Sequence, residues 1–421
     1  MTDVRTKSAA GRMFLAAAFM ITSGLAPSAT AAEAERFEVW ALDQADTVKG
    51  KGGGLLYIWT SDAIGSNPAA AKPTVVDLAA AAEAAGCPVA KRPHMMRGNH
   101  AGPPTHAIIS NVGSGHVQFV DIASRKIAGC VEGMGNAHTA EATPDDTMVI
   151  VADLAGQKLH KIETDYRGNS FKRVETLSLA TEELKNSVGT PEIKPVCHNY
   201  TADSRLAYVT LAGGGLLVVD VGTGDGGFPM KVAHAYPKAM VPGIGCGAFR
   251  LPEERMVTNG ESGAKGGDDF LFVFDTRAAI SGKFPNPVKI ELPGEDTHSA
   301  TSCVDKKGNE HMLTLMRVSN HVNVVELRTN RVAETLSIAR PFSPDPKPDV
   351  GEMIGNRLFV ALRGANPLTA INALKNPKRT PGVAVLTVSE SCHSVSWKES
   401  DLMPMKNNPD ADPHGLNVFR R

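Results

Sequence analysis

Side chains that bind transition metals recur at matching points of a repeated sequence pattern. They are His94, His138, His198, Cys246, His298, Asp349 and His414. Each lies near the start of a unit of roughly 40 to 50 residues in which apolar runs alternate with tight turns. Imidazole, thiolate and carboxylate ligands suit copper or zinc better than magnesium or calcium. If folding brings these positions together, the sequence predicts a transition-metal site.

The repeated unit is clearest in residues 196–223. A short run containing His198 is followed by turns at 202–204 and 213–215, each leading into an apolar run. This pattern predicts three antiparallel strands joined by tight turns. With a fourth, outer strand it is typical of a propeller blade, whose innermost strand runs along a central channel. Equivalent positions of successive blades therefore converge on one axis.

Seven such units can be traced, so we expect an all-β fold, a seven-bladed β-propeller with four-stranded antiparallel blades. The first unit, residues 37–85, lacks an innermost strand. Residues 412–419, which contain His414, have the composition of one. The ring is predicted to close by this C-terminal strand joining the N-terminal blade, which leaves no free sheet edge.

The first 31 residues have the pattern of a secretory signal peptide. Arg5, Lys7 and Arg12 precede an apolar run at 13–26, and small residues at 29–31 suit cleavage. The run is short for a membrane span, so the alternative of a retained N-terminal anchor is less favoured. We expect residues 32–421 to form a single propeller domain in the periplasm, without membrane insertion after cleavage.

Composition excludes some partners. The formal net charge of -1 gives no electrostatic reason to expect nucleic acid or an anionic membrane surface. The chain has only six cysteines in 421 residues, so we expect that disulfides can add stability but do not define the fold. Cys87 and Cys130 flank one unit and can meet. No pairing is predicted for the others, and Cys197 should point away from the channel because it precedes His198 in a strand.

A lone histidine at a blade entrance is usually a structural hydrogen-bonding partner, and repeats inherit similar residues. Five histidines with Cys246 and Asp349 at matching positions favour the metal. His116 and His321 follow turns and are predicted to be solvent-exposed, while His100 or His106 can orient a metal ligand. The glycine-rich insertion with Glu261 and residues 263–269 is expected to be a hairpin tip, with a catalytic lid as the less favoured alternative. No motif assigns a catalytic residue, and no haem-attachment or phosphate-loop signature is present.

Several stretches resemble the YVTN-type repeat family, best seen at residues 110–121, 212–220 and 318–326. A metal ring at a propeller hub also resembles the catalytic domain of nitrous oxide reductase and, more loosely, thiocyanate dehydrogenase. That resemblance implies copper ligands at His94, His138, His198, His298 and His414, with Asp349 as a further candidate. The chain departs from it because no cupredoxin-like domain follows, Cys246 replaces an expected ligand and no His-His pair occurs.

Three functions follow as hypotheses. The first is a periplasmic copper-dependent oxidoreductase that acts on a small inorganic or sulfur compound and passes electrons to a redox partner. The second is a non-catalytic copper or zinc carrier or chaperone that meets a metal-transfer protein. The third is a metal-free scaffold for a redox subunit, similar to the heavy subunit of methylamine dehydrogenase; a propeller that holds haem d1 is a further alternative.

Overall fold

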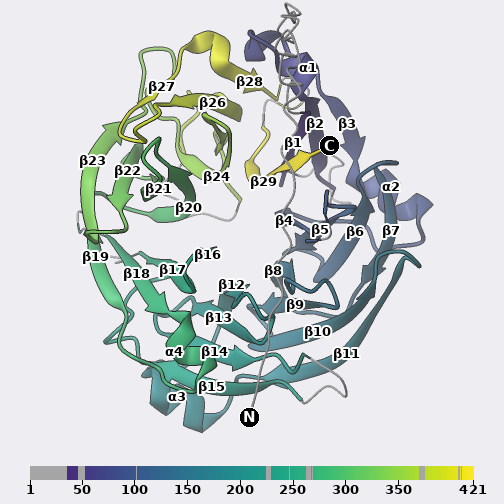
Figure 1. The fold of residues 1–421 in the computed structure, drawn as a ribbon. Helices are drawn as coiled ribbons and strands as arrows, with labels where there is room; N and C mark the ends of the chain where they lie inside the picture. The colour runs from purple at the N-terminus through teal and green to yellow at the C-terminus, as the bar shows by residue number, and fades with distance from the viewer. Residues whose placement is uncertain are drawn as a thin grey trace, which may run out of the picture. The chain divides into compact units, whose positions relative to one another are not determined.

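The computed structural model describes residues 36–45, 53–100, 102–223, 229–245, 247–261, 267, 269–368, 375–405, 408 and 410–421. Residues 36–421 form one compact unit, in which seven antiparallel sheets are arranged in a ring (Figure 1). The predicted seven-bladed propeller is therefore confirmed. The predicted signal peptide and Cys246 lie outside the described residues.

Each blade is numbered by its place in the ring, and its strands run from the centre outward. Blade 1 consists of β29 (Pro413–Arg420), β1 (Phe37–Asp43), β2 (Leu55–Thr60) and β3 (Thr74–Asp77). Blade 2 consists of β4 (Pro93–Gly98), β5 (His106–Asn111), β6 (His116–Asp121) and β7 (Lys126–Val131). Blade 3 consists of β8 (Ala137–Ala142), β9 (Met148–Asp153), β10 (Lys158–Asp165) and β11 (Ser170–Ser178). Blade 4 consists of β12 (Pro195–Tyr200), β13 (Leu206–Leu211), β14 (Leu216–Asp220) and β15 (Lys231–Tyr236).

The remaining blades follow the same plan. Blade 5 consists of β16 (Ala248–Leu251), β17 (Arg255–Gly260), β18 (Asp269–Asp275) and β19 (Val288–Leu292). Blade 6 consists of β20 (Thr297–Val304), β21 (Glu310–Met316), β22 (His321–Glu326) and β23 (Arg331–Ser337). Blade 7 consists of β24 (Pro348–Ile354), β25 (Arg357–Leu362), β26 (Gly382–Val388), β27 (Val395–Ser396) and β28 (Leu402–Pro404). The predicted four-stranded pattern is altered here. β27 and β28 pair with opposite ends of β26, on either side of the 3-10 turn at Glu399–Asp401.

The ring closes between the two ends of the chain, as predicted. β29 pairs antiparallel with β1, and Val39 is opposite Val418 in the register. Neighbouring innermost strands contact one another in the order β29, β4, β8, β12, β16, β20, β24 and back to β29. The innermost strands therefore surround one central axis.

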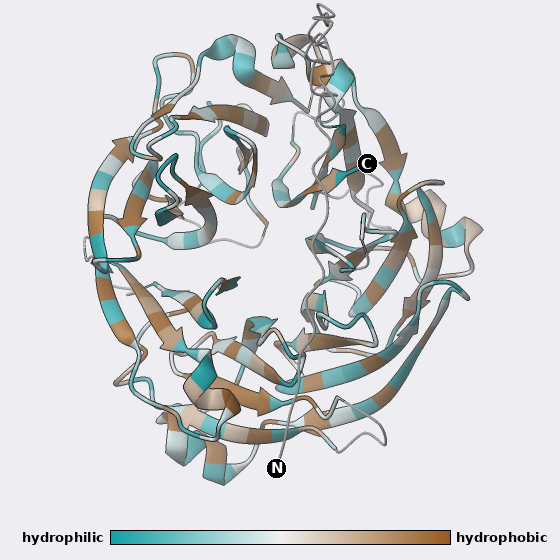
Figure 2. Cartoon of the chain, viewed as in Figure 1, coloured by the Kyte–Doolittle hydropathy of each residue, from teal (hydrophilic) through white to brown (hydrophobic). Residues whose placement is uncertain are grey.

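Seven apolar layers hold the blades together, one between each pair of neighbouring sheets in the described part of the chain. The middle strands are buried on both faces, and all six residues of β13 are buried. Outer strands such as β11 alternate between exposed and half-buried residues, as the alternating colours of Figure 2 show. This explains why the middle strands appear in the sequence as continuous apolar runs.

Two disulfides link neighbouring blades. Cys87, just after helix α2 (Leu78–Ala84), is bonded to Cys130 of β7, as predicted. Cys303 of β20 is bonded to Cys392, a pair that the sequence did not indicate. The other short α-helices in the described ranges are α1 (Ser61–Ile64), α3 (Glu182–Val188) and α4 (Thr276–Ile280). No helix within the described ranges has the length and apolar character needed to cross a membrane.

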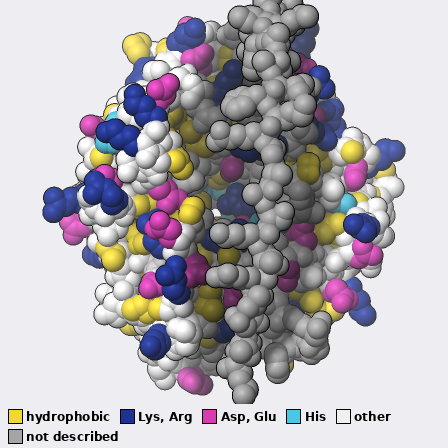
Figure 3. All heavy atoms as spheres, viewed as in Figure 1, with side chains coloured by type: hydrophobic (Ala, Val, Ile, Leu, Met, Phe, Trp, Pro, Cys, Tyr) yellow, Lys and Arg dark blue, Asp and Glu magenta, His cyan; other side chains and the backbone are white. Residues whose placement is uncertain are grey.

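Surface charge agrees with the near-zero net charge. Acidic and basic side chains are mixed over the part of the face in Figure 3 that is not grey. This part of the surface offers no extended patch of one sign for a polyanionic partner.

Candidate metal centre

Five predicted ligands occupy the same position in their blades. His94, His138, His298, Asp349 and His414 are each the second residue of an innermost strand. In each of the five blades, the pairing of the innermost strand with the next strand is interrupted by a register shift at this position. A β-bulge leaves a residue outside the ladder and turns its side chain in a new direction. The bulge is therefore the local reason why these side chains lie together.

The imidazoles form two close pairs. Nε2 of His94 lies 3.1 Å from Nε2 of His138, and Nε2 of His298 lies 3.2 Å from Nε2 of His414. The rings of His94 and His414 lie 3.9 Å apart between centroids, which joins the pairs into one cluster. Two nitrogens bound to one ion at about 2.0–2.1 Å in tetrahedral geometry are separated by about 3.3 Å. Both Nε2 separations are close to that value.

Carbonyl oxygens fix the orientation of three of the rings. Nδ1 of His138 lies 3.0 Å from the backbone oxygen of Val196, and Nδ1 of His414 lies 3.1 Å from that of His94. Nδ1 of His94 lies 3.0 Å from Oε1 of Gln44. Because a carbonyl oxygen only accepts, each Nδ1 carries the proton and each Nε2 presents a lone pair to the cluster. Such outer contacts commonly orient metal-binding histidines.

The lone pairs of His94 and His138 therefore face each other without a proton between them. Burial lowers the pKa of His138 to about 4. Burial, together with repulsion from a charged His414 or His138, also holds the pKa of His94 well below its usual range. Both rings are neutral at physiological pH, so an added proton does not relieve the contact. A bound cation would satisfy both lone pairs.

Asp349 supplies a carboxylate next to the second pair. Its Oδ1 lies 2.8 Å from Nε2 of His298 and 3.7 Å from Nε2 of His414. The ligand atoms of His298, Asp349 and His414 all lie within 4.8 Å of one another, so these three residues can hold a metal ion. Burial opposes ionisation of Asp349, but the charges around it, including that of Arg363, keep its pKa well below the ordinary value.

The other two predicted ligands are placed differently. Nε2 of His198 lies 3.1 Å from the hydroxyl oxygen of Tyr200, which in turn donates to the backbone oxygen of Glu141 in blade 3. No hydrogen bond or ring contact within the described ranges joins His198 to the four clustered histidines. The register of β12 explains this difference. The irregularity in β12 lies between Pro195 and His198, so His198, the fourth residue of the strand, comes after it, whereas each clustered residue lies within the irregularity of its own strand. Cys246 lies outside the described residues.

The secondary candidates also differ from expectation. His116 was predicted to be solvent-exposed, but it is fully buried, and burial lowers its pKa to about 4. This prediction was wrong because the turn before His116 is covered by the segments that flank blade 2: Gly113 donates to the backbone oxygen of Lys91, and Met134 donates to that of Gly115. Nδ1 of His106 lies 3.0 Å from Thr105 and its Nε2 lies 2.9 Å from Asn169, not from a ligand. Nε2 of His100 lies 3.1 Å from the backbone oxygen of Ala142.

Two buried arginines at one end of the cluster were missed by sequence reasoning. Arg363 donates to both carboxylate oxygens of Asp412 at 2.7 and 2.8 Å, and to Oδ2 of Asp349 at 2.6 Å. Arg317 donates to both oxygens of Asp296 at 2.9 and 2.7 Å. Each arginine directly follows the second strand of its blade, next to the start of the innermost strand. These ion pairs hold Asp349 in place at this end of the cluster.

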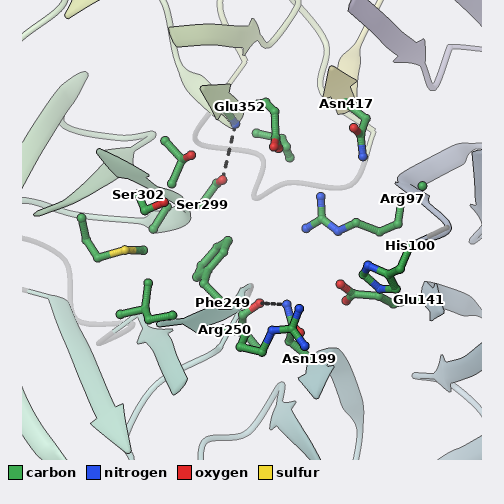
Figure 4. Close-up of a pocket in the computed structure, with 18 of the residues that line it drawn as sticks. Arg97, His100, Glu141, Asn199, Phe249, Arg250, Ser299, Ser302, Glu352 and Asn417 are labelled. Atoms are coloured by element: carbon green, nitrogen blue, oxygen red, sulfur yellow. Dashed lines mark hydrogen bonds between the residues drawn. The ribbon is translucent and has the colours of Figure 1, made fainter. Parts of the chain in front are cut away.

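A pocket of about 320 Å³ adjoins the other end. Ser299 and Val350, which directly follow His298 and Asp349, are part of its wall. Five further wall residues stand three positions after a clustered residue in the sequence: Arg97, Glu141, Thr301, Glu352 and Asn417. Figure 4 labels all of them except Thr301, around the central space of the pocket. This constant offset was the sequence signal that could have revealed the pocket.

No protein-family model matches the chain. A search of curated proteins also gives no match. Membership of the YVTN-type family and kinship with copper-binding propellers therefore stay predictions.

Solved structures give the fold. A protein from Lactobacillus plantarum matches with a TM-score of 0.59 at 11% identity, over 91% of this chain and 99% of that one. Dihydro-heme d1 dehydrogenase NirN in complex with DHE matches with a TM-score of 0.55 at 11% identity, over 90% and 74%. Apo AztD from Citrobacter koseri matches with a TM-score of 0.52 at 9% identity, over 92% and 98%. At these identities the likeness concerns the propeller architecture alone.

Proposed function

We propose that this protein is an exported propeller that binds a transition metal at its hub, with copper favoured, and acts as an oxidoreductase on a small molecule. One observation supports the metal above all. Three buried or half-buried imidazoles, those of His94, His138 and His414, direct Nε2 lone pairs into one cluster while carbonyl oxygens hold their Nδ1 protons. A purely structural cluster would place a proton between facing nitrogens.

The donor set guides the choice of metal. Imidazole nitrogens suit copper, zinc, iron and nickel, and for a given site affinity among divalent ions peaks at copper. Zinc remains the alternative because three imidazoles and one carboxylate also match its preferences. When bound, copper supplies one-electron chemistry. The chain's own residues orient the donors and keep the cluster largely dry, since His94, His298, His414 and Asp349 are all less than a tenth exposed.

Access favours catalysis over metal transfer. Catalytic metal sites keep one side open to substrate, and the 320 Å³ pocket adjoins this cluster. A carrier must instead present its ion to a partner protein, which is difficult for donors buried in a channel. Export is supported by the predicted signal peptide together with two disulfides, since such bonds persist in oxidising compartments such as the periplasm.

Metal content of the native protein tests the proposal. The chain is isolated from its export compartment and analysed by elemental analysis, visible absorption and electron paramagnetic resonance. We expect copper near or above one equivalent, lost in His298→Ala and His414→Ala and kept in the control His321→Ala, whose half-buried ring lies at the start of the third strand of blade 6.

Other results assign other functions. Tight zinc without redox activity would favour the carrier, and a haem spectrum would favour a haem-binding propeller. A wild-type chain that binds neither copper nor zinc after loading would refute the metal centre and leave the scaffold.

A further inference from the structure

The pocket beside the cluster contains two arginines that form no ion pair with the described residues. Arg97 of β4 is half-buried and Arg250 of β16 is exposed, and both side chains line the pocket (Figure 4). No hydrogen bond or ion pair within the described part of the chain involves either guanidinium. Arg317 and Arg363, by contrast, are each paired with a buried carboxylate. Two guanidinium groups are therefore left to face the contents of the pocket.

The rest of the wall suits a small polar ligand. Hydroxyl groups of Thr301 and Ser302 and the amide of Asn417 line the same pocket. A guanidinium presents two parallel N–H donors that match the spacing of two oxygens in a planar oxyanion. A volume of about 320 Å³ admits a small ion with its water and leaves no room for a folded partner.

One carboxyl group shares the pocket and is strongly buried. Glu141 of β8 is only 7% exposed. Its carboxyl group is within electrostatic range of Arg97, Arg250 and Glu352. Its charge also acts on the thiol of Cys197 and the phenol of Tyr200 in β12. A carboxylate at this place competes with an incoming anion for both arginines.

We propose that this pocket binds a small planar oxyanion between Arg97 and Arg250 and takes it up together with a proton carried by Glu141. The positive charge of the two arginines is offset when Glu141 and Glu352 are ionised and becomes available when Glu141 is protonated. The anion site shares no side chain with the metal cluster, so this proposal does not depend on the proposal that the hub binds a metal. If both hold, the ligand reaches the metal through an anion-selective entrance.

Titration behaviour agrees with this arrangement. Burial raises the pKa of Glu141 to about 7, opposed by Arg97 and Arg250 and reinforced by the like charge of Glu352. Burial also raises the pKa of Glu352. Glu141 is therefore half protonated near neutral pH, and the offsetting charge in the pocket falls as the pH decreases through that value.

Nitrate binding to the metal-free full-length chain tests the proposal. Nitrate is planar and does not titrate between pH 5 and 8, so any coupled proton belongs to the protein. Isothermal titration calorimetry at constant ionic strength is expected to give saturable binding with a Kd of about 1 mM or tighter at pH 6. Arg97→Gln and Arg250→Gln are each expected to weaken binding at least tenfold. Arg167→Gln, an exposed arginine on the turn between β10 and β11, serves as the matched control and should bind as the wild type does.

The proton is tested separately. Raising the pH from 6 to 8 should weaken binding by the wild type up to about tenfold, because one proton must be taken up above the pKa of Glu141. Titrations in two buffers of different ionisation enthalpy should show proton uptake near neutral pH. Glu141→Gln should bind at pH 8 as tightly as the wild type does at pH 6, without that uptake.

Two results would overturn the proposal. Nitrate binding that is absent at pH 6, or unchanged in both arginine variants, removes the anion site. An undiminished pH dependence in Glu141→Gln removes the role of Glu141. Because these measurements use metal-free protein, they are independent of the metal analysis proposed above.

Discussion

The two ends of the hub carry the same types of charged residue in opposite arrangements. At the end of the hub where the innermost strands begin, Arg363 and Arg317 are buried and paired with Asp412 and Asp296. At the other end, Arg97 and Arg250 line a pocket and pair with no carboxylate among the described residues. The first arrangement stabilises and orients the cluster. The second leaves charge available for a ligand.

Burial also has different effects on the pKa values of the carboxyl groups at the two ends. At the end where the arginines are paired, burial opposes ionisation of Asp349, but the charges around it, those of His298 and His414 first and then those of Arg363 and Arg317, keep its pKa well below the ordinary value. At the pocket end Glu141 has no such partner at close range, and burial raises its pKa to about 7. Fixed ion pairs are suited to structure, and an uncompensated carboxyl group is suited to exchanging a proton.

The largest expected effect is on stability. Arg363→Gln leaves Asp349 and Asp412 buried without their shared cation, and we expect the free energy of unfolding to fall by about 3–5 kcal/mol. The equivalent change at the pocket end, Arg97→Gln, should alter it by no more than about 0.5 kcal/mol, because that half-buried guanidinium forms no hydrogen bond or ion pair with the described residues. Guanidinium denaturation of the metal-free chain measures both. Equal losses in the two variants would show that the ends do not differ in this way.

The next effect concerns metal affinity. Gln44→Met removes the oxygen that accepts from Nδ1 of His94 and releases the orientation of that ring. Loss of such an outer contact typically weakens metal binding about 10- to 100-fold. Gln118→Met is the matched control, because Gln118 is equally buried in β6 but does not contact the cluster. Competition with a chromophoric chelator gives both affinities, and equal values for the two variants would contradict the role of Gln44.

Two buried groups of neighbouring innermost strands, His198 of β12 and Glu141 of β8, should respond to pH with opposite sign. Burial lowers the pKa of His198 to about 3, so unfolding takes up a proton below about pH 6.5 and the wild type loses stability there as the pH falls. Glu141, with its raised pKa, contributes stability that is present below about pH 4.5 and is lost as the pH rises toward 7. Each group changes the free energy of unfolding by about 1.4 kcal/mol per pH unit within its window.

Variants isolate these two contributions in metal-free protein. Relative to the wild type, His198→Gln should gain stability as the pH is lowered from 6.5 to 5, and Glu141→Gln should lose it. Denaturation midpoints at three pH values across this range provide the measurement. Slopes of the same sign for both variants would disprove the assignment.

The smallest effect is expected at the histidine that stands apart. Since His198 lies against Tyr200 and not against the clustered rings, His198→Gln should change the affinity for copper or zinc less than threefold, whereas His298→Ala abolishes tight binding. The same chelator competition decides this. A large loss in His198→Gln would mean that the ion draws this ring into the cluster.

The sequence by itself determined the architecture. Turn residues, apolar runs and their recurrence predicted the blades, and the composition around His414 predicted the strand that closes the ring. It also identified Cys87 and Cys130 as partners. These features could be predicted because they depend on local patterns or on the need to leave no sheet edge unpaired.

Only the tertiary structure decided which candidates meet. His94 and His198 look alike in sequence, but the bulge precedes His198 and coincides with His94, and a shift in register changes where a side chain points. The bond between Cys303 and Cys392 and the pairing of Arg363 with Asp412 join residues far apart in the chain. Such contacts depend on how neighbouring blades pack, which no local pattern of residues specifies.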